Sequence, residues 1–448
     1  MLKQPHIMRR AAVFRQTSEF HDWFAEQRAA QDHRVTPAPL RGLDGWSFEP
    51  GTGDIRHRSG RFFSIEGIAA ETDNREVAAW SQPIIVQPES GILGILVKEF
   101  AGVPHFLLQV KMEPGNINIL QLSPTVQATR SNFTRVHQGN AVPYLEHFLA
   151  PRSGRVIFDA LQSEQGSWFL GKRNRNMIIE ADGDVPVRDG FCWLTLDQIG
   201  ELLNVENLVN MDTRTVLSGL PDGWAVQGRS TGAEGRALHG TAALLSWFTE
   251  AKASHRLDRR RIPLAEVGGW GESDGAVVHE SGRFFKVIGV DVEAQGREVA
   301  RWSQPMIAPV GRGVIAFLTR RIEGTVHLLV NARTEAGSFD VLEMGPTVQC
   351  APANYEGLPA GSRPRFLDEV LSAAPERVLL DVVHSEEGGR FYHAENRYLA
   401  VEAPGDFPLE VGPDHIWMTP HQLGAMVRHS HHVNVEARNL LACLRFLR

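Results

Sequence analysis

Two cation–carboxylate pairs lie within otherwise apolar, strand-like segments. Lys111 and Glu113 occur in QVKMEPGN, and Arg333 and Glu335 occur in NARTEAGS. Residues two apart on a strand point to the same face, so each pair could flank a ligand. Such a cation can hold an anion, and such a carboxylate can move a proton. An ion pair at an exposed strand edge is the competing interpretation, and the sequence does not separate the two.

Further carboxylates follow hydrophobic segments that predict buried strands. Glu164 lies in SEQG, after VIFDAL, and Glu386 lies in SEEG, after VLLDVV. Polar side chains in a loop held by a rigid sheet are typical of functional sites. A role in forming the turn is the alternative.

Two loops that follow a shared TVQ motif also carry polar side chains. They are TRSNF at 129–133 and APANY at 351–355. Arg130 suits a phosphate oxygen or a sugar hydroxyl, whereas the aligned Asn132 and Asn354 could equally mark a left-handed turn. The candidate binding residues in and around these loops, with one serine of the SEQGS segment, are Thr129, Arg130, Ser131, Asn132, Phe133, Ser167, Gln349, Cys350, Ala351, Asn354 and Tyr355.

Aromatic side chains supply another pair of binding candidates. Trp46 and Trp270 each begin a strand-like segment after a Gly-rich stretch. An aromatic plane can stack on a nucleotide base at small entropic cost, although a place in the core is the commoner role for tryptophan. Trp80 and Trp302, in AWSQP and RWSQP, are expected in the core, and the following Ser-Gln-Pro is predicted to form a turn.

These features occur in pairs because the chain is duplicated. HRSGRFF at 57–63 returns as HESGRFF at 279–285, and NREVAAWSQPII at 74–85 returns as GREVARWSQPMI at 296–307, both at an offset of 222 residues. A unit of about 200 residues is too long for a solenoid repeat and large enough for its own core. We therefore predict two tandem domains and a Gly-rich linker, at residues 18–218, 241–448 and 219–240 respectively.

The elements that must position these residues are mostly strands. Short runs rich in β-branched and aromatic residues alternate with Gly, Pro and Asn. GILGILVKEF and AGVPHFLLQVKM predict a hairpin that turns at Ala101-Gly102. Three pairs of helices are predicted. The first pair, at residues 18–30 and 241–253, has Ser18 and Thr241 as N-caps. The second pair is at residues 143–150 and 364–373, and the third, at residues 195–203 and 419–427, carries Thr-x-x-Gln capping patterns. The whole predicts an α+β fold of mixed sheets with flanking helices, arranged twice.

Composition narrows the class of protein. The net charge is −7, with 42% hydrophobic and 22% charged residues, which is typical of a soluble globular protein. RLDRRRIP at 256–263 is the one basic cluster and is predicted to be a solvated loop, so no nucleic-acid partner is expected. Cys192, Cys350 and Cys443 show neither pairing nor metal spacing, which favours a reducing compartment. Without a membrane-length apolar stretch or a leader pattern, we expect no membrane association and a cytoplasmic location.

Several long blocks resemble the NDP-hexose 2,3-dehydratases. They are SGRFF, REVAxWSQP, LSPTVQATRSNF, LQSEQGSWF, KRNRNM and SEEGGRFYHAENRYL, and the resemblance runs from about residue 18 to the C-terminus. It implies two Nudix-like domains, a homodimer, and dTDP-4-keto-6-deoxy-D-glucose as substrate in deoxysugar and antibiotic biosynthesis. It also implies a 3-ketoreductase that acts next on the product. The sequence lacks the glutamate cluster of the Nudix signature, so metal-dependent hydrolysis is not expected.

The implied reaction is an elimination with definite chemical needs. The C4 ketone acidifies the C3 hydrogen, and the enolate formed by its removal expels the C2 hydroxyl to give a 3,4-diketo-2,6-dideoxy sugar. A base, a donor to the ketone and an acid for the hydroxyl are required. The elimination itself requires no redox cofactor or metal, and motifs for them are absent from the sequence, so no cofactor is expected. The candidate acid–base groups are Glu113, Glu335, Glu164, Glu386 and Tyr392, and the candidate cations for the ketone or the diphosphate are Lys111, Arg333 and Arg130.

Two other functions stay open on the sequence alone. A non-catalytic sugar-nucleotide binding protein would keep the tryptophans and cations but could lose the glutamates. A Nudix-type hydrolase would need Mg²⁺ and several glutamates on one helix, which the sequence does not contain. The paired residues predict a pocket in each half, and the divergent loops TRSNF and APANY predict chemistry in one half without indicating which.

Overall fold

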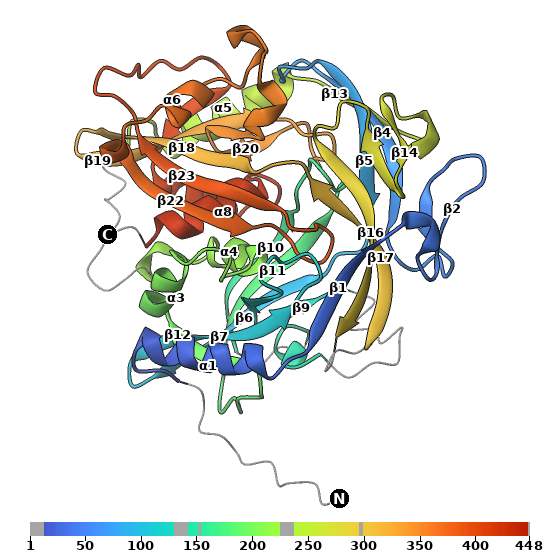
Figure 1. The fold of residues 1–448 in the computed structure, drawn as a ribbon. Coiled ribbons are helices and arrows are strands. Elements are labelled where there is room, and N and C mark those ends of the chain that lie inside the picture. The colour runs from blue at the N-terminus through green and yellow to red at the C-terminus, as the bar shows by residue number, and fades with distance from the viewer. Residues whose placement is uncertain (1–12, 130–141, 151–153, 225–236, 295–298, 447–448) are drawn as a thin grey trace, which may run out of the picture.

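The computed structural model describes the chain except for residues 1–12, 130–141, 151–153, 225–236, 295–298 and 447–448. It contains two seven-stranded and two five-stranded sheets, with few helices (Figure 1). The predicted α+β class and the duplicated arrangement of mixed sheets are therefore confirmed. In the described part of the chain, no helix is long and apolar enough to cross a membrane.

A seven-stranded sheet forms the centre of the first half. Its strands, in spatial order, are β10 (Arg155–Ser163), β11 (Arg173–Glu180), β6 (Ile92–Phe100), β7 (Val103–Met112) and β12 (Phe191–Thr195), with β8 (Leu120–Pro124) beside β7 and β9 (Val126–Ala128) beside β6. β11 runs parallel to β6, and β6 and β7 form the predicted hairpin. Ala101 and Gly102 have φ values of 51° and 81°, the pair of positive angles that a two-residue type I′ turn requires.

The second half repeats this sheet. Its strands are β22 (Val378–Ser385), β23 (Glu395–Glu402), β18 (Gly313–Ile322), β19 (Thr325–Arg333) and β20 (Glu343–Gly345), with β21 (Val348–Cys350) beside β18 and β24 (His415–Met418) beside β19. Between the two sheets lie the helices α4 (Met211–Leu217) and α8 (Val435–Leu444), which pack against each other (Figure 1). One hydrophobic core joins both sheets through these helices, from Ile95 and Phe106 to Phe317 and Tyr398.

The first strand of each half lies in a sheet of the other half. β1 (His33–Ala38) pairs antiparallel with β16 (Phe285–Ala294), and β13 (Leu257–Ile262) pairs antiparallel with β4 (Ser64–Thr72). The two five-stranded sheets are completed by β14 (Trp270–Ser273), β15 (Ala276–His279) and β17 (Arg301–Pro309), and by β2 (Trp46–Phe48), β3 (Ile55–His57) and β5 (Ala79–Val86). The predicted loop at RLDRRRIP is wrong, because this segment is β13, although four of its side chains are exposed.

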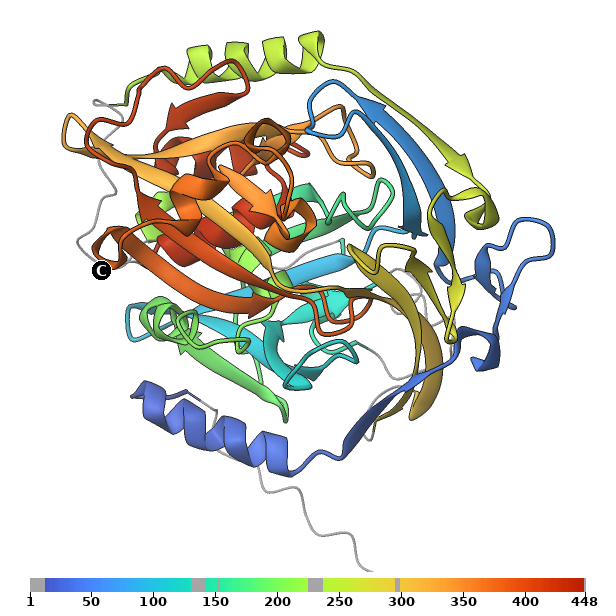
Figure 2. The same cartoon turned by 45° about the horizontal axis from the view of Figure 1, so that its top comes forward.

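The helix predictions hold for four elements and fail for two caps. α1 (Thr17–Ala29) and α5 (Thr241–Ser254) lie on opposite outer faces, dark blue and yellow-green in Figure 2. Their N-caps are Gln16 and Gly240 rather than Ser18 and Thr241; Gln16 is favoured because Glu19 completes a capping box. The Thr-x-x-Gln capping boxes are present in α3 (Leu196–Leu202) and α7 (Pro420–Val427).

The predicted helices in the middle of each half are shorter than expected. Residues 143–150 contain only the 3₁₀ turn η2 (Leu145–His147), and residues 364–373 contain α6 (Leu367–Leu371). Each begins after a residue with positive φ, Tyr144 or Phe366, a conformation that a continuing α-helix cannot include. Both segments pack over one face of their seven-stranded sheet.

Candidate active site

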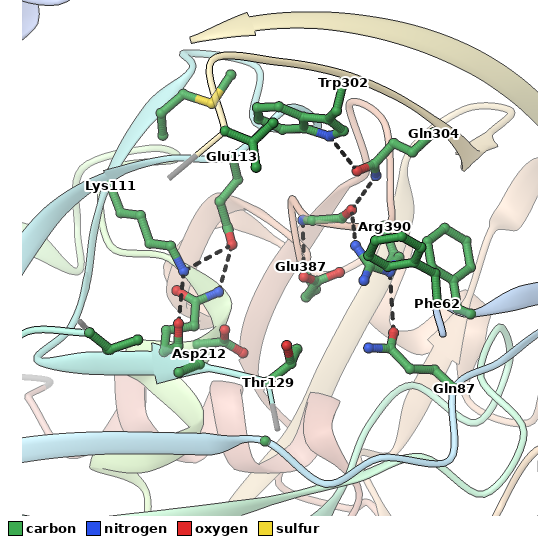
Figure 3. A pocket seen from close by; sticks show the side chains of 18 of the residues that line it. Phe62, Gln87, Lys111, Glu113, Thr129, Asp212, Trp302, Gln304, Glu387 and Arg390 are labelled. Carbon is green, nitrogen blue, oxygen red and sulfur yellow. Dashed lines mark hydrogen bonds and ion pairs between the residues drawn. The ribbon is translucent and has the colours of Figure 1, made fainter. Parts of the chain in front are cut away.

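A cavity of about 1260 Å³ opens on the first half's seven-stranded sheet and is also lined by segments of the second half. Among the predicted site residues, those that line it are Trp46, Lys111, Glu113, Thr129 and Glu164. Side chains of the second half enter from β17 and from the loop after β22, as Figure 3 shows for Trp302, Gln304, Glu387 and Arg390. Side chains of both halves therefore form the wall of this cavity.

Lys111 and Glu113 form an ion pair on this wall. Lys111 lies near the end of β7 and Glu113 just beyond it, with 3.8 Å between Nζ and Oε1. Gln127 of β9 donates from Nε2 to Glu113 Oε1 at 2.6 Å, and Lys111 donates to the Gln127 carbonyl at 3.2 Å. Glu113 is only 4% exposed. A cation and a carboxylate at the end of one strand thus line the same cavity.

The floor of the cavity carries two further buried carboxyl groups. Glu164 follows β10 and accepts a hydrogen bond from Asn174 at 2.7 Å; its Oε2 has no partner among the residues that the structure describes. Burial raises the pKa of Glu164, against the opposing charges of Arg438 and Lys172. Burial also raises the pKa of Asp212, at the start of α4, well above its usual value, and the neighbouring glutamates add to this rise. These surroundings disfavour the charged form of Asp212.

The second half contributes a carboxyl group and a guanidinium through the 386–390 loop. Gly389 N donates to Glu387 Oε1 at 3.0 Å, and burial, followed by the charge of Glu113, raises the pKa of Glu387 to about 7. Arg390 donates to Gln87 Oε1 at 3.2 Å and lies 4.2 Å from the centre of the Phe63 ring. Sequence reasoning did not select Glu387 or Arg390. The available signal was the mismatch between SEQGSW and SEEGGR, where their counterparts are Gln165 and Trp168.

The repeated WSQ block holds this loop in place. Trp302 Nε1 donates to Gln304 Oε1 at 2.9 Å, and Gln304 Nε2 donates to the Gly389 carbonyl at 2.6 Å (Figure 3). In the first half, Trp80 and Gln82 make the same bonds, ending on the Ser167 carbonyl at 2.7 Å. The Ser-Gln-Pro segments lie inside β5 and β17, so the predicted turns are wrong. Both tryptophans are partly exposed rather than fully in the core.

The corresponding region of the second half holds a much smaller cavity, of about 230 Å³. It is lined by Arg333 and Gln349 and by a hairpin turn of the first half, residues 73–76. Arg75 of this turn donates to the Thr334 carbonyl at 2.9 Å, and Asn74 accepts from Thr334 N at 3.0 Å. The hairpin thereby occupies space beside the second cation–carboxylate pair, in which 3.7 Å separates Arg333 Nε from Glu335 Oε1.

Glu335 and Glu386 of the second half each accept several protein hydrogen bonds. Glu335 Oε1 accepts from Ser167 at 2.7 Å and from Gln349 at 2.8 Å. Glu386 accepts from the side chains of three residues at 2.6–2.8 Å, Gln165, Asn396 and Tyr398. In the first half, Asn176 stands where the second half has Tyr398, so Glu164 receives no equivalent hydroxyl.

Of the two predicted tryptophans only Trp46 lines the large cavity, and the other predicted residues are scattered. Trp46 is 7% exposed and donates to the Ser303 carbonyl at 2.8 Å, whereas Trp270 packs against Phe285 with 4.5 Å between ring centres. Tyr392 stacks on His393 at 4.0 Å, away from the lining of either cavity. The Asn354 side chain accepts a hydrogen bond from Phe284 N. Cys350, Ala351 and Tyr355, close to it in the sequence, are partly buried. Arg130, Ser131, Asn132 and Phe133 lie outside the described residues.

Comparison with known proteins identifies the family. The family model described as NDP-hexose 2,3-dehydratase matches residues 17–220 and again residues 241–444. Relatives named dTDP-4-dehydro-6-deoxy-alpha-D-glucopyranose 2,3-dehydratase occur in Streptomyces violaceoruber (59% identity, 96% of this chain and 97% of the relative), Amycolatopsis orientalis (50%, 96% and 90%) and Saccharopolyspora spinosa (48%, 96% and 92%). The matches cover both halves of this chain. It belongs to the NDP-hexose 2,3-dehydratase family.

Proposed function

We propose that this chain removes water across C2 and C3 of dTDP-4-keto-6-deoxy-D-glucose and that the reaction takes place in the cavity of the first half. The observation that carries this proposal is the Lys111–Glu113 pair on the cavity wall. The volume of about 1260 Å³ suits a nucleotide sugar, since pockets for drug-sized ligands span roughly 300–1,000 Å³. The names of three relatives support the same substrate.

Glu113 is assigned as the base and Lys111 as the cation at the ketone. The carboxylate removes the C3 proton, and the C3–H electrons form the enolate, whose negative charge develops on the C4 oxygen. An ammonium group at that oxygen stabilises the developing charge, which is the larger part of such catalysis. The enolate then forms the C2–C3 double bond as the C2–O bond breaks. The resulting enol becomes a 3,4-diketo-2,6-dideoxy sugar.

The contrast between the halves supports chemistry in the first half alone. Glu335 and Glu386 already receive several protein hydrogen bonds, which leaves them little capacity to exchange protons with a substrate. The cavity beside Arg333, of about 230 Å³, is too small for a complete nucleotide sugar. We assign Arg333, Glu335 and Glu386 to structure, and we assign Trp46, Thr129 and Glu164 to the catalytic cavity.

Further parts of the proposal rest on the family resemblance. They are Nudix-like domains at residues 18–218 and 241–448, a homodimer, a cytoplasmic location, and a 3-ketoreductase that consumes the unstable diketone. A parallel β6–β11 pair inside an otherwise antiparallel sheet, repeated as β18–β23, supports one ancestral fold for both domains. Size-exclusion chromatography with light scattering tests the dimer, and a coupled assay with candidate reductases tests the next step.

The activity is tested by incubating the purified chain with dTDP-4-keto-6-deoxy-D-glucose and EDTA, followed by mass spectrometry. We expect loss of one water, undiminished by EDTA, because the ketone alone acidifies the C3 hydrogen. Release of a nucleoside monophosphate would contradict the proposal and support a Nudix-type hydrolase. Unchanged substrate that is nevertheless bound would support a binding protein.

A further inference from the structure

We infer that Glu387, which belongs to the second half, is the general acid that protonates the departing C2 hydroxyl in the cavity of the first half. This inference rests on the proposed function and adds to it a catalytic group from the opposite half of the chain. The reaction centre would then be assembled from residues more than 270 positions apart, Lys111 and Glu113 on one side and Glu387 on the other.

The position of Glu387 suits this role. Figure 3 shows the side chains of Glu113 and Glu387 around one space, with Lys111 on one side and Arg390 on the other. Glu387 Oε1 is fixed by the Gly389 N–H at 3.0 Å. Oε2 is buried and has no partner among the residues that the structure describes. An oriented carboxyl group with one unused oxygen can donate its proton to a substrate hydroxyl.

The charges around Glu387 favour its protonated form. Three carboxyl groups interact electrostatically with Glu387: Glu113 beyond β7, Glu164 beyond β10 and Asp212 on α4. The positive charges of Arg390 and Lys172 act in the opposite direction. Burial and these like charges disfavour a second anion beside Glu113. Two carboxyl groups with different charge states, one base and one acid, are the arrangement that an elimination requires.

These two groups account for every proton transfer in the reaction. Glu113 takes the C3 proton, and Glu387 gives a proton to the C2 oxygen as the C2–O bond breaks, so that water leaves. Tautomerisation then needs a proton at C2 and the removal of the 3-hydroxyl proton. Glu113 can supply the first and Glu387 can accept the second, which restores both groups without any other reactant.

The second half lacks this arrangement. The counterpart of Glu387 is Gln165, whose amide donates to Glu386 at 2.8 Å, and the counterpart of Arg390 is Trp168. Each half thus places the loop after its β10 or β22 strand beside the carboxylates of the other half. An amide cannot act as the acid, so only the loop that carries Glu387 completes an acid–base pair. This asymmetry is independent of the cavity volumes.

The test is Glu387→Gln assayed in D₂O, with ¹H NMR at C3 and mass spectrometry of the product. We expect water loss to fall about 100-fold or more, while the C3 hydrogen of the recovered substrate still exchanges with deuterium, because the base remains. Glu113→Gln should lose exchange and elimination together. Binding of dTDP, measured by calorimetry, shows whether each variant keeps a folded cavity.

The pH profile gives a second measurement. In the wild-type chain kcat should fall as pH rises above about 7, since the acid form is then depleted, and Glu387→Gln should lack this alkaline limb. Gln165→Met is the matched control, because Gln165 is the counterpart of Glu387 and contacts Glu386 of the second half; it should keep the wild-type rate. Undiminished elimination by Glu387→Gln, or equal loss of exchange and elimination, would overturn the inference. A wild-type chain that forms no dehydrated product would instead overturn the proposed function.

Discussion

Arg214, on α4 of the first half, donates from Nη2 to the backbone carbonyl of Ser385 in the second half at 2.9 Å. Arg438, on α8, makes the reciprocal bond to the carbonyl of Ser163 at 2.5 Å. Both guanidinium groups are fully buried. Because Ser385 directly precedes the 386–390 loop, Arg214 fixes the start of the segment that carries Glu387 into the opposite cavity.

Arg214→Met should therefore destabilise the chain and disturb the site. Arg214 also donates to the Val209 carbonyl at 2.8 Å, so the substitution leaves two buried acceptors unsatisfied. At about 1–3 kcal/mol for each such group, we expect a loss of about 2–6 kcal/mol in the free energy of unfolding. Urea unfolding measures this, with an exposed control such as Arg260→Met, and a loss below about 1 kcal/mol would contradict the assigned role.

Glu113→Gln should lower kcat by about 100-fold or more, as expected for removal of a general base. Glu335→Gln is the matched substitution in the second half and should keep most of the activity, because Glu335 accepts structural hydrogen bonds from Ser167 and Gln349. The rate of water loss, followed by mass spectrometry, separates the two. Equal losses in both variants would contradict a single active half.

Lys111→Met should lower kcat/KM by about 10²–10³-fold, since it removes a cation from the developing enolate. The control is Arg333→Met, whose cavity is not assigned to catalysis. Calorimetric titration with dTDP should show that Lys111→Met still binds the nucleotide. A large effect of Arg333→Met on kcat with little effect of Lys111→Met would reverse the assignment of the two halves.

His255 should make stability depend on pH. Its Nδ1 lies 3.2 Å from Asp73 and its Nε2 lies 2.7 Å from Asp414, so it links α5 to the hairpin beside the second cavity. Burial lowers its pKa, but the two carboxylates outweigh burial and raise it above the usual value of about 6.5. The stabilisation is thus complete below that value and is lost as pH rises through the raised pKa. Melting temperatures of the wild type and His255→Asn should converge at high pH, and parallel curves would contradict this.

The duplication in the sequence predicted part of the site and concealed another part. Aligned pairs such as Lys111 and Arg333 were found because both copies keep a cation at the same offset. Glu387 and Arg390 were missed because they differ from their counterparts, Gln165 and Trp168, and a residue that differs between the copies does not stand out as a pair. The proposed role of Glu387 as the acid depends on that difference. Mismatches inside a conserved block are therefore the better signal in a duplicated enzyme.

The fold was predicted where periodicity was visible and missed where it was not. The β6–β7 hairpin follows from local turn chemistry. α4 was not predicted, because all seven of its residues are buried although four are polar, so its sequence shows no apolar stripe. The strand exchange could not be read from the sequence either. β4 and β16 are the equivalent strands of the two repeats and have similar sequences, so no local feature indicates which of them β1 or β13 will join.

The exchanged strands also set an order of events during synthesis. A ribosome that has completed the first half has not yet made Leu257–Ile262, the strand that covers the edge of β4. Meanwhile His33–Ala38 must wait for Phe285–Ala294 before it has a sheet to join. Nascent chains fold from the N-terminus as they emerge, at about 5–20 residues per second, and an uncovered strand edge is a template for aggregation. For several seconds of translation the first half thus carries an open edge, and a chain truncated between its halves would keep that edge permanently.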